Sequence, residues 1–134
     1  SGEWRNTDGY YINNDGEFFP LSDSFSARAL IVSGAFFKDP KKLKTEKGEM
    51  MMELIRFLNS DPFWKAQVAQ LDADKNGEIN LITVFGDQRI EFGTAEGFES
   101  KFNKLNLFYE KVLSKDWSRY SRISIKFQDQ IVCE

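Results

Sequence analysis

The sequence predicts an α+β fold in which two main helices pack on one face of a mixed, largely antiparallel sheet. Short apolar runs separated by turns that contain Gly and Asn are typical of antiparallel strands. Two longer segments, residues 45–59 and 94–112, carry apolar residues at helical spacing. The resulting order, β, β, β, α, β, β, β, α, β, places each helix after a group of strands that it can cover.

The first predicted elements are a hairpin and a short strand. Residues 10–13 and 17–19 flank a turn at 14–16, where Asn, Asp and Gly tolerate positive φ. Residues 29–32 form a short apolar run that is consistent with a buried strand. The Asp39-Pro40 pair then interrupts the chain before the first helix.

The first helix is predicted over residues 45–59, and three strands follow it. The helix has one apolar face that can pack on the sheet, formed by Met51, Leu54, Ile55 and Leu58. Asp61-Pro62 is expected to start a further short turn, because Pro is favoured at the first helical position. The next strands are expected at residues 68–73, 79–85 and 89–92.

The second main helix is expected to follow Thr94, whose side chain can cap its N-terminus. Its predicted apolar face comprises Phe98, Phe102, Leu105, Phe108, Tyr109 and Val112. The chain closes with apolar odd positions from Ile123 to Cys133 that alternate with mostly polar even ones; Asp129 interrupts the apolar set. This period of two predicts a single closing strand with one buried face.

Composition excludes several classes of function. The net charge of −3 provides no positive field to attract nucleic acid. The chain has no His and a single Cys, Cys133, which rules out Cys/His zinc sets, Ser/His/Asp triads and an internal disulfide. No apolar run reaches the ~18 residues of a membrane span, and we expect no cofactor. Residues 1–134 are expected to form one domain, and Ser1-Gly2 is typical of a cloning remnant on a piece of a longer protein.

The sharpest motif match is to a calcium loop of the EF-hand type. The oxygen ligands, the turn glycine and the apolar residue of such a loop are matched by Asp72, Asp74, Asn76, Gly77 and Ile79. Thr83 stands where the loop needs a bidentate Glu, and the segment that follows Glu78 favours a strand instead of a helix. A hairpin turn explains the same residues. A helix over residues 63–71 would leave a weak calcium site open as an alternative, formed by Asp72, Asp74, Asn76 and Glu78.

A carbohydrate-acting enzyme is a third hypothesis, because glycosidases use a pair of carboxylates. The acidic residues considered are Glu78, Asp87, Glu91, Glu96 and Glu99. They fall in expected turns, on exposed strand faces or at a helix N-terminus, and their spacing singles out no pair. The sequence therefore predicts no catalytic set.

The closing segment indicates a different kind of function. A strand at the end of a chain often lies at a sheet edge, where unpaired N–H and C=O groups can bind an extended segment of a partner. Backbone bonds alone barely offset the cost of association, so side chains must contribute. The candidate anchors are Phe127 and Ile131, with Trp117 and Tyr120 nearby. Core packing is the alternative for the first two, because they share a face with the other odd positions.

Five segments together resemble a known family: residues 10–22, 32–34, 83–93, 101–107 and 122–132. The set is similar to the extracytoplasmic β domain of the bacterial cell-division protein FtsQ/DivIB, in particular to its Bacteroidetes-type versions. The resemblance covers nearly the whole chain. It implies a parent protein with one membrane span and a POTRA domain ahead of this segment.

The resemblance also implies a non-catalytic, periplasmic scaffold at the division septum. In this family the domain holds the bitopic proteins FtsB/DivIC and FtsL in the divisome, and FtsB binds chiefly by strand addition at the last strand. Carried over by position, the contact falls on Lys126, Phe127, Gln128, Asp129, Gln130 and Ile131. Phe127 stands where Tyr is common in the family, so this chain lacks a hydroxyl there.

Overall fold

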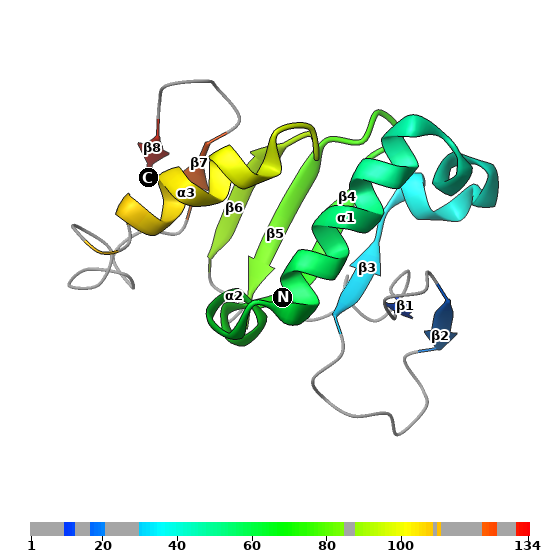
Figure 1. Ribbon diagram of the computed structural model, residues 1–134, viewed down its shortest axis with the longest axis horizontal. Helices are drawn as coiled ribbons and strands as arrows, with labels where there is room; N and C mark the ends of the chain where they lie inside the picture. Colours follow the sequence, from blue (N-terminus) through cyan, green and yellow to red (C-terminus); the bar gives the residue numbers. More distant parts are fainter. Residues whose placement is uncertain are drawn as a thin grey trace.

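The structure is a computed structural model that describes residues 10–12, 17–20, 30–84, 88–108, 110, 122–125 and 131–134. These residues form an eight-stranded mixed sheet. Helices α1 (Glu46–Ser60) and α3 (Phe98–Phe108) lie on the same face of that sheet (Figure 1). The predicted α+β class is therefore confirmed.

The strands lie in the order β2-β1-β3-β4-β5-β6-β7-β8. Their bounds are β1 Tyr10–Ile12, β2 Phe18–Pro20, β3 Ile31–Ser33, β4 Val68–Ala73, β5 Ile79–Thr83, β6 Arg89–Gly93, β7 Arg122–Ser124 and β8 Val132–Cys133. The β3/β4 and β6/β7 pairs are parallel, and the other neighbouring pairs are antiparallel. The antiparallel β1/β2 pair corresponds to the predicted first hairpin. Each parallel pair is joined by a connection that contains a main helix, because parallel strands need a long crossover.

Polar side chains set the starts of the helices between β3 and β4. Two short 3-10 helices, η2 (Ala35–Lys38) and η3 (Pro40–Lys44), precede α1. The hydroxyl of Thr45 accepts a hydrogen bond from the N–H of Gly48 at 3.1 Å, which caps α1. Asp61 caps the short α2 (Pro62–Gln67) in the same way, as expected from Asp61-Pro62. The chain becomes strand β4 at Val68, so the alternative of a helix over residues 63–71 is wrong beyond Gln67.

An aromatic cluster centred on Phe102 of α3 holds the helices to the sheet. The Phe102 ring centroid lies 4.7 Å from that of Phe57 in α1, 5.1 Å from that of Trp64 in α2 and 5.0 Å from that of Phe92 in β6. Full burial of a side chain of this type contributes about 1.5–3 kcal/mol. The Trp64 indole N–H donates to Oδ1 of Asn106 at 3.0 Å, so its polar atom is satisfied.

Helix α3 begins later than the sequence predicts. Its first residue is Phe98, whose N–H donates to the Ala95 carbonyl at 3.2 Å. Thr94 therefore lies too far ahead to be the cap, and its carbonyl accepts from the Lys101 ammonium at 2.8 Å. The predicted apolar face is confirmed for Phe98, Phe102, Leu105 and Phe108, while Tyr109 and Val112 lie outside the described residues.

The closing segment contains two strands where the sequence predicts one, so that prediction is wrong. Strand β7 pairs with β6 on one side and with β8 on the other, and Ile123 stands opposite Cys133. In this register odd-numbered residues of β7 stand opposite odd-numbered residues of β8, so Ile123 and Cys133 share one face. The same alternation therefore fits either one strand or a hairpin.

Gly34 allows the chain to leave β3 against the backbone of β4. Its φ is 101° and its ψ is 169°, a conformation that is almost confined to glycine. A Cβ at this position would stand 2.2 Å from the carbonyl oxygen of Ala73. No side chain can be accommodated here unless the two segments move apart.

Gly34→Ala should lower the free energy of unfolding by about 2–6 kcal/mol. Backbone strain costs about 1–3 kcal/mol, and the clash with Ala73 adds about 1–3 kcal/mol. Gly97→Ala is the matched control, because its φ is 67° but nothing lies within 4 Å of the added Cβ. Urea denaturation followed by Trp fluorescence measures both variants, and equal losses would contradict the close approach at Gly34.

Candidate functional site

The turn between β4 and β5 holds the residues of the calcium hypothesis, and their oxygens serve the hairpin. Oδ1 of Asp74 accepts the N–H of Asn76 at 2.8 Å and that of Glu78 at 3.0 Å. Oδ1 of Asp72 accepts the hydroxyl of Ser33, on β3, at 2.8 Å. Gly77 closes the turn with a φ of 83°.

The calcium alternative receives no support. Strand β5 begins at Ile79, close to where an EF-hand loop gives way to its exiting helix. The carbonyls of Lys75 and Asn76 accept ammonium groups, from Lys42 at 2.7 Å and from Lys47 at 3.5 Å. Positive charge thus already occupies this side of the turn and would repel a cation. Within the described ranges, no group of three Asp, Glu or Cys residues could hold a metal ion.

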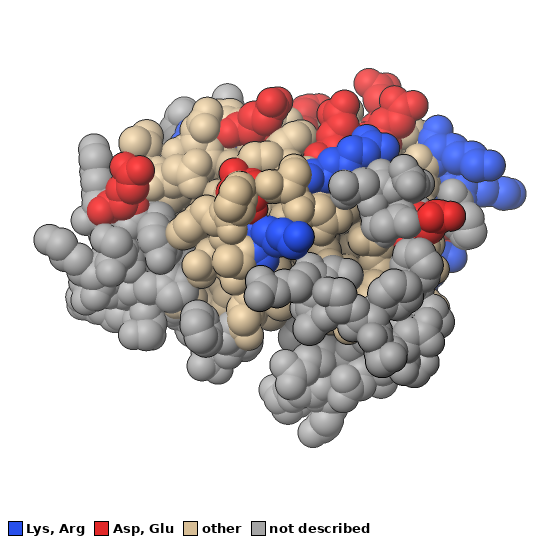
Figure 2. Space-filling model, turned by 60° about the horizontal axis from the view of Figure 1, so that its bottom comes forward, with Lys and Arg blue, Asp and Glu red and all other residues tan. Residues whose placement is uncertain are grey.

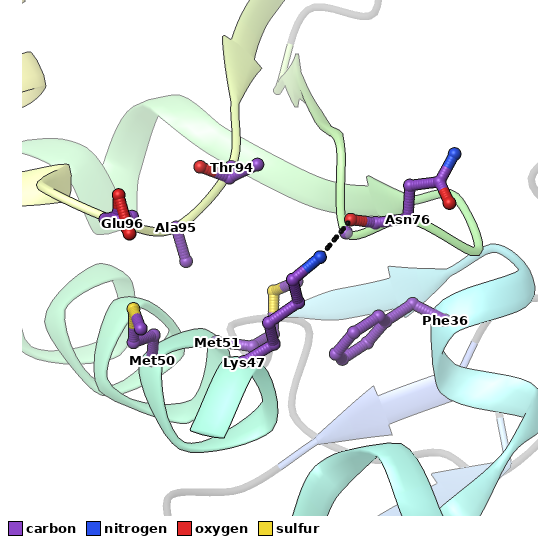
Figure 3. Close-up of a pocket in the computed structure, with 9 residues that line it drawn as sticks. Phe36, Lys47, Met50, Met51, Asn76, Thr94, Ala95 and Glu96 are labelled. Atoms are coloured by element: carbon purple, nitrogen blue, oxygen red, sulfur yellow. Dashed lines mark hydrogen bonds between the residues drawn. The ribbon is translucent and has the colours of Figure 1, made fainter. Parts of the chain in front are cut away.

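A small pocket lies beside this turn, between α1 and the segment that leads into α3 (Figure 3). Its volume is about 200 Å³, below the roughly 300–1,000 Å³ of small-molecule sites. Phe36, Met50 and Met51 contribute apolar surface, and Lys47 reaches across to the carbonyl of Asn76 (Figure 3). Glu96 is the one carboxylate among the lining residues, so the pocket does not bring together a catalytic pair.

The other carboxylates of the carbohydrate hypothesis are spread over the molecule. Glu78 ends the β4–β5 turn, Glu91 lies on β6, Glu96 lines the pocket, Glu99 is exposed on α3 and Asp87 is outside the described residues. On the face shown in Figure 2, acidic and basic side chains both occur along the border above the grey residues. The described residues of that face present no broad surface of one sign of charge.

An ion-pair cluster joins the last three strands on the face opposite the helices. Arg122 of β7 binds Glu91 of β6 in a bidentate manner, with Nε 2.8 Å from Oε2 and Nη2 2.9 Å from Oε1. Its Nη1 also donates to Oε2 of Glu134, the residue after β8. Arg89 reaches Oε2 of Glu91 at 3.3 Å. Hydrogen bonding to Glu91 raises the pKa of Arg122, so the guanidinium remains charged.

Strand β8 is the last strand of the described sheet, and its outer edge has a defined pattern of backbone groups. The N–H of Glu134 donates to the Arg122 carbonyl at 2.8 Å, and the N–H of Arg122 donates to the Glu134 carbonyl at 3.0 Å. Such pairs alternate along antiparallel strands, so the N–H and C=O of Cys133 point away from β7. The N–H of Ile125 donates to the carbonyl of Glu91 at 2.9 Å, which fits the same alternation on the β6 side.

The side chains near this edge are partly covered. Ile131 and Cys133 are half-buried and pack against the core, while Val132 is 37% exposed. Burial raises the pKa of the Cys133 thiol, which favours its protonated form. Of the six predicted partner-binding residues, the structure describes Ile131; the other five, Lys126, Phe127, Gln128, Asp129 and Gln130, lie outside the described residues.

The pairing of Arg122 with Glu91 and Glu134 was not predicted from the sequence. The signal available was weak: Arg122 occupies an even position beside the apolar odd positions of the closing segment. Such a position indicates the open face of the sheet. The partner depends on which strands are neighbours, and alternation within one strand does not contain that information.

Comparison with known proteins identifies the family. Residues 4–134 match the family described as FtsQ/DivIB, C-terminal related. The chain belongs to this family. The resemblance seen in the sequence is thereby confirmed, and the FtsQ/DivIB family implies a role in cell division. No curated protein matches the chain.

Membership also bears on location and on catalysis. FtsQ/DivIB proteins are division scaffolds that are typically non-enzymatic, and the family suggests an extracytoplasmic domain of a membrane protein. Among the described residues, no helix is long and apolar enough to cross a bilayer.

Asp74→Ala tests the structural role of the β4–β5 turn. The change removes the acceptor of two exposed N–H groups and should cost about 1 kcal/mol of stability. Lys75→Ala is the control in the same turn, because the turn uses the carbonyl of Lys75. Melting curves should be the same with calcium and with EDTA for the wild type and both variants. A calcium-dependent rise in the melting temperature of the wild type would contradict the structural role.

Proposed function

We propose that this FtsQ/DivIB-family domain is a non-catalytic divisome scaffold that binds a partner segment by strand addition at the outer edge of β8. The observation that carries the proposal is the outward direction of the Cys133 N–H and C=O groups. No other described strand pairs with β8 on that side. Such an edge is a template for an extended peptide.

The proposed partners are FtsB/DivIC-like and FtsL-like division proteins. They follow from the resemblance to FtsQ/DivIB, and family membership supports a division role in general. In this proposal the domain is periplasmic, acts at the septum, and is membrane-anchored through a helix elsewhere in its parent protein. The proposed contact comprises residues 126–131 together with the outer edge of β8.

Strand β7 is an unsuitable template for the added strand. Arg122–Ser124 already pairs with β6 and β8, so both of its edges are used. The added segment must therefore lie outside β8. This moves the backbone contact from the middle of the closing segment toward its end.

Side-chain anchors are necessary in addition to the backbone. Each hydrogen bond contributes about 0.5–1.5 kcal/mol net, whereas association costs about 4–15 kcal/mol. A strand of two residues cannot offset that cost through its ladder alone. Val132 is exposed beside the edge, and Phe127 and Ile131 are the apolar anchors that the sequence predicts.

Phe127→Asp and Ile131→Lys should each abolish pull-down of the FtsB/DivIC-like protein of the same bacterium, because a charge replaces an apolar anchor. Melting curves verify that the variants are folded. Val84→Asp is the matched control, since Val84 is 52% exposed and follows β5. Full binding by both folded variants would refute the proposed contact.

Cys133→Pro tests the backbone contact separately from the side chain. Proline removes an N–H that points outward and is tolerated at edge strands, whereas Cys133→Ala removes the thiol alone. We expect Cys133→Pro to weaken binding about fivefold or more, equivalent to a bond of about 1 kcal/mol. Cys133→Ala should bind like the wild type. Equal affinity of the two variants, measured by fluorescence anisotropy, would show that the partner does not pair with this edge.

A further inference from the structure

We infer that Arg122 is a positioning residue for partner binding, because its ion pairs with Glu91 and Glu134 hold β8 against β7. The inference rests on the proposed function at β8. In this role Arg122 holds β8 in place before a partner binds. Arg122 has no need to touch the partner in this role.

Strand β8 requires such support because its own attachment is small. It spans two residues and pairs with a strand of three residues. A pairing of this length provides few backbone hydrogen bonds, each of which contributes about 0.5–1.5 kcal/mol net. Hydrophobic anchoring is also limited, since Val132 is exposed and both Ile131 and Cys133, which pack against the core, are only half-buried. The described backbone bonds and side-chain packing therefore hold β8 less firmly than the central strands are held.

The guanidinium of Arg122 supplies a connection across three strands. Its bidentate contact with Glu91, at 2.8 and 2.9 Å, fixes the plane of the guanidinium group against β6. The remaining nitrogen, Nη1, is then directed at the carboxylate of Glu134. Glu134 is thus attached to Arg122 both through the backbone and through its side chain. A lysine could not form this fork, because an ammonium group has no planar array of donors.

The degree of exposure supports a division of roles among these charges. The Arg122 side chain is 30% exposed and that of Glu91 is 15% exposed, so their mutual geometry is partly shielded from water. The Glu134 side chain is 65% exposed, and its contact with Nη1 of Arg122 links the end of β8 to the Arg122–Glu91 pair. Arg89 contacts the same Glu91 carboxylate from β6 itself, so its ion pair does not connect β8 to the sheet.

The functional consequence follows from a pre-equilibrium. If the partner adds only to docked β8, the apparent dissociation constant rises in inverse proportion to the docked fraction. Detachment lowers the observed association rate and leaves the dissociation rate of the formed complex nearly unchanged. Loss of a direct contact would instead act mainly on the dissociation rate.

The test compares Arg122→Gln with Arg89→Gln as the matched control. Both variants remove one positive charge beside Glu91, but the first alone breaks the link to Glu134. Arg122→Gln should weaken binding of the FtsB/DivIC-like partner about tenfold, corresponding to β8 being docked about one-tenth of the time. The loss should appear in the association rate. Arg89→Gln should bind within about twofold of the wild type, and a tenfold loss in it as well would overturn the inference.

A disulfide between residues 123 and 133 should restore partner binding to the Arg122→Gln variant. Ile123 and Cys133 are a directly opposed pair without mutual backbone hydrogen bonds, which places Cα atoms about 4.5 Å apart, within the disulfide range. Ile123→Cys therefore allows a staple to the native Cys133 in the presence of oxidised glutathione. Arg122→Gln/Ile123→Cys should bind weakly when reduced. When oxidised, it should match oxidised Ile123→Cys.

Hydrogen exchange of the Glu134 and Arg122 amides tests the positioning role without any partner. These amides should exchange faster in Arg122→Gln and slowly again after oxidation of the double variant. Unchanged exchange in Arg122→Gln would refute the positioning role even if binding falls. Binding that stays weak despite the staple would mean that Arg122 contacts the partner directly. Failure of the wild type to bind would refute the proposed function, and the exchange data alone would then decide the role of Arg122.

Discussion

Burial of the Phe102 ring between the helices and the sheet is the constraint on which the rest of the structure depends. The ring joins α3 to α1, α2 and β6 at once, so the sheet has one face that must be apolar. A row of side chains meets this demand across the strands: Val32, Leu71, Leu81, Ile90 and Ile123 are neighbours in register, and all are fully buried. The row ends at Cys133, which is half-buried.

That row also determines what the opposite face can do. Because successive side chains point to opposite faces, placing Ile90 and Ile123 in the core turns Glu91 and Arg122 toward the other side. There they form the ion pairs that reach Glu134. Core packing and charge thus act on the same strands from opposite faces. At the proposed partner edge the core packing is only partial, because Cys133 is half-buried, and the ion pairs of Arg122 provide further attachment through Glu134.

Much of the fold could be predicted from the sequence because its signals are local. The first hairpin, α1 and the apolar face of α3 each follow from residues close together in the chain. The closing segment could not be predicted in this way. Ile123 and Cys133 lie ten positions apart with matching parity, so alternation cannot distinguish one extended strand from two strands that face each other. The calcium motif at Asp72 was ambiguous for a related reason, since the same Asp, Asn and Gly residues suit a tight turn.

The outer edge of β8 is the central feature of the proposed function, and amide hydrogen exchange of Cys133 in the presence and absence of the FtsB/DivIC-like partner tests it most directly. The Cys133 N–H points away from β7, so it should exchange readily in the free domain and become strongly protected in the complex. The Glu134 N–H, already bonded to Arg122, should change little by comparison. Contradiction would come from a saturated complex in which Cys133 still exchanges readily and protection appears elsewhere, for example around the pocket beside Asn76.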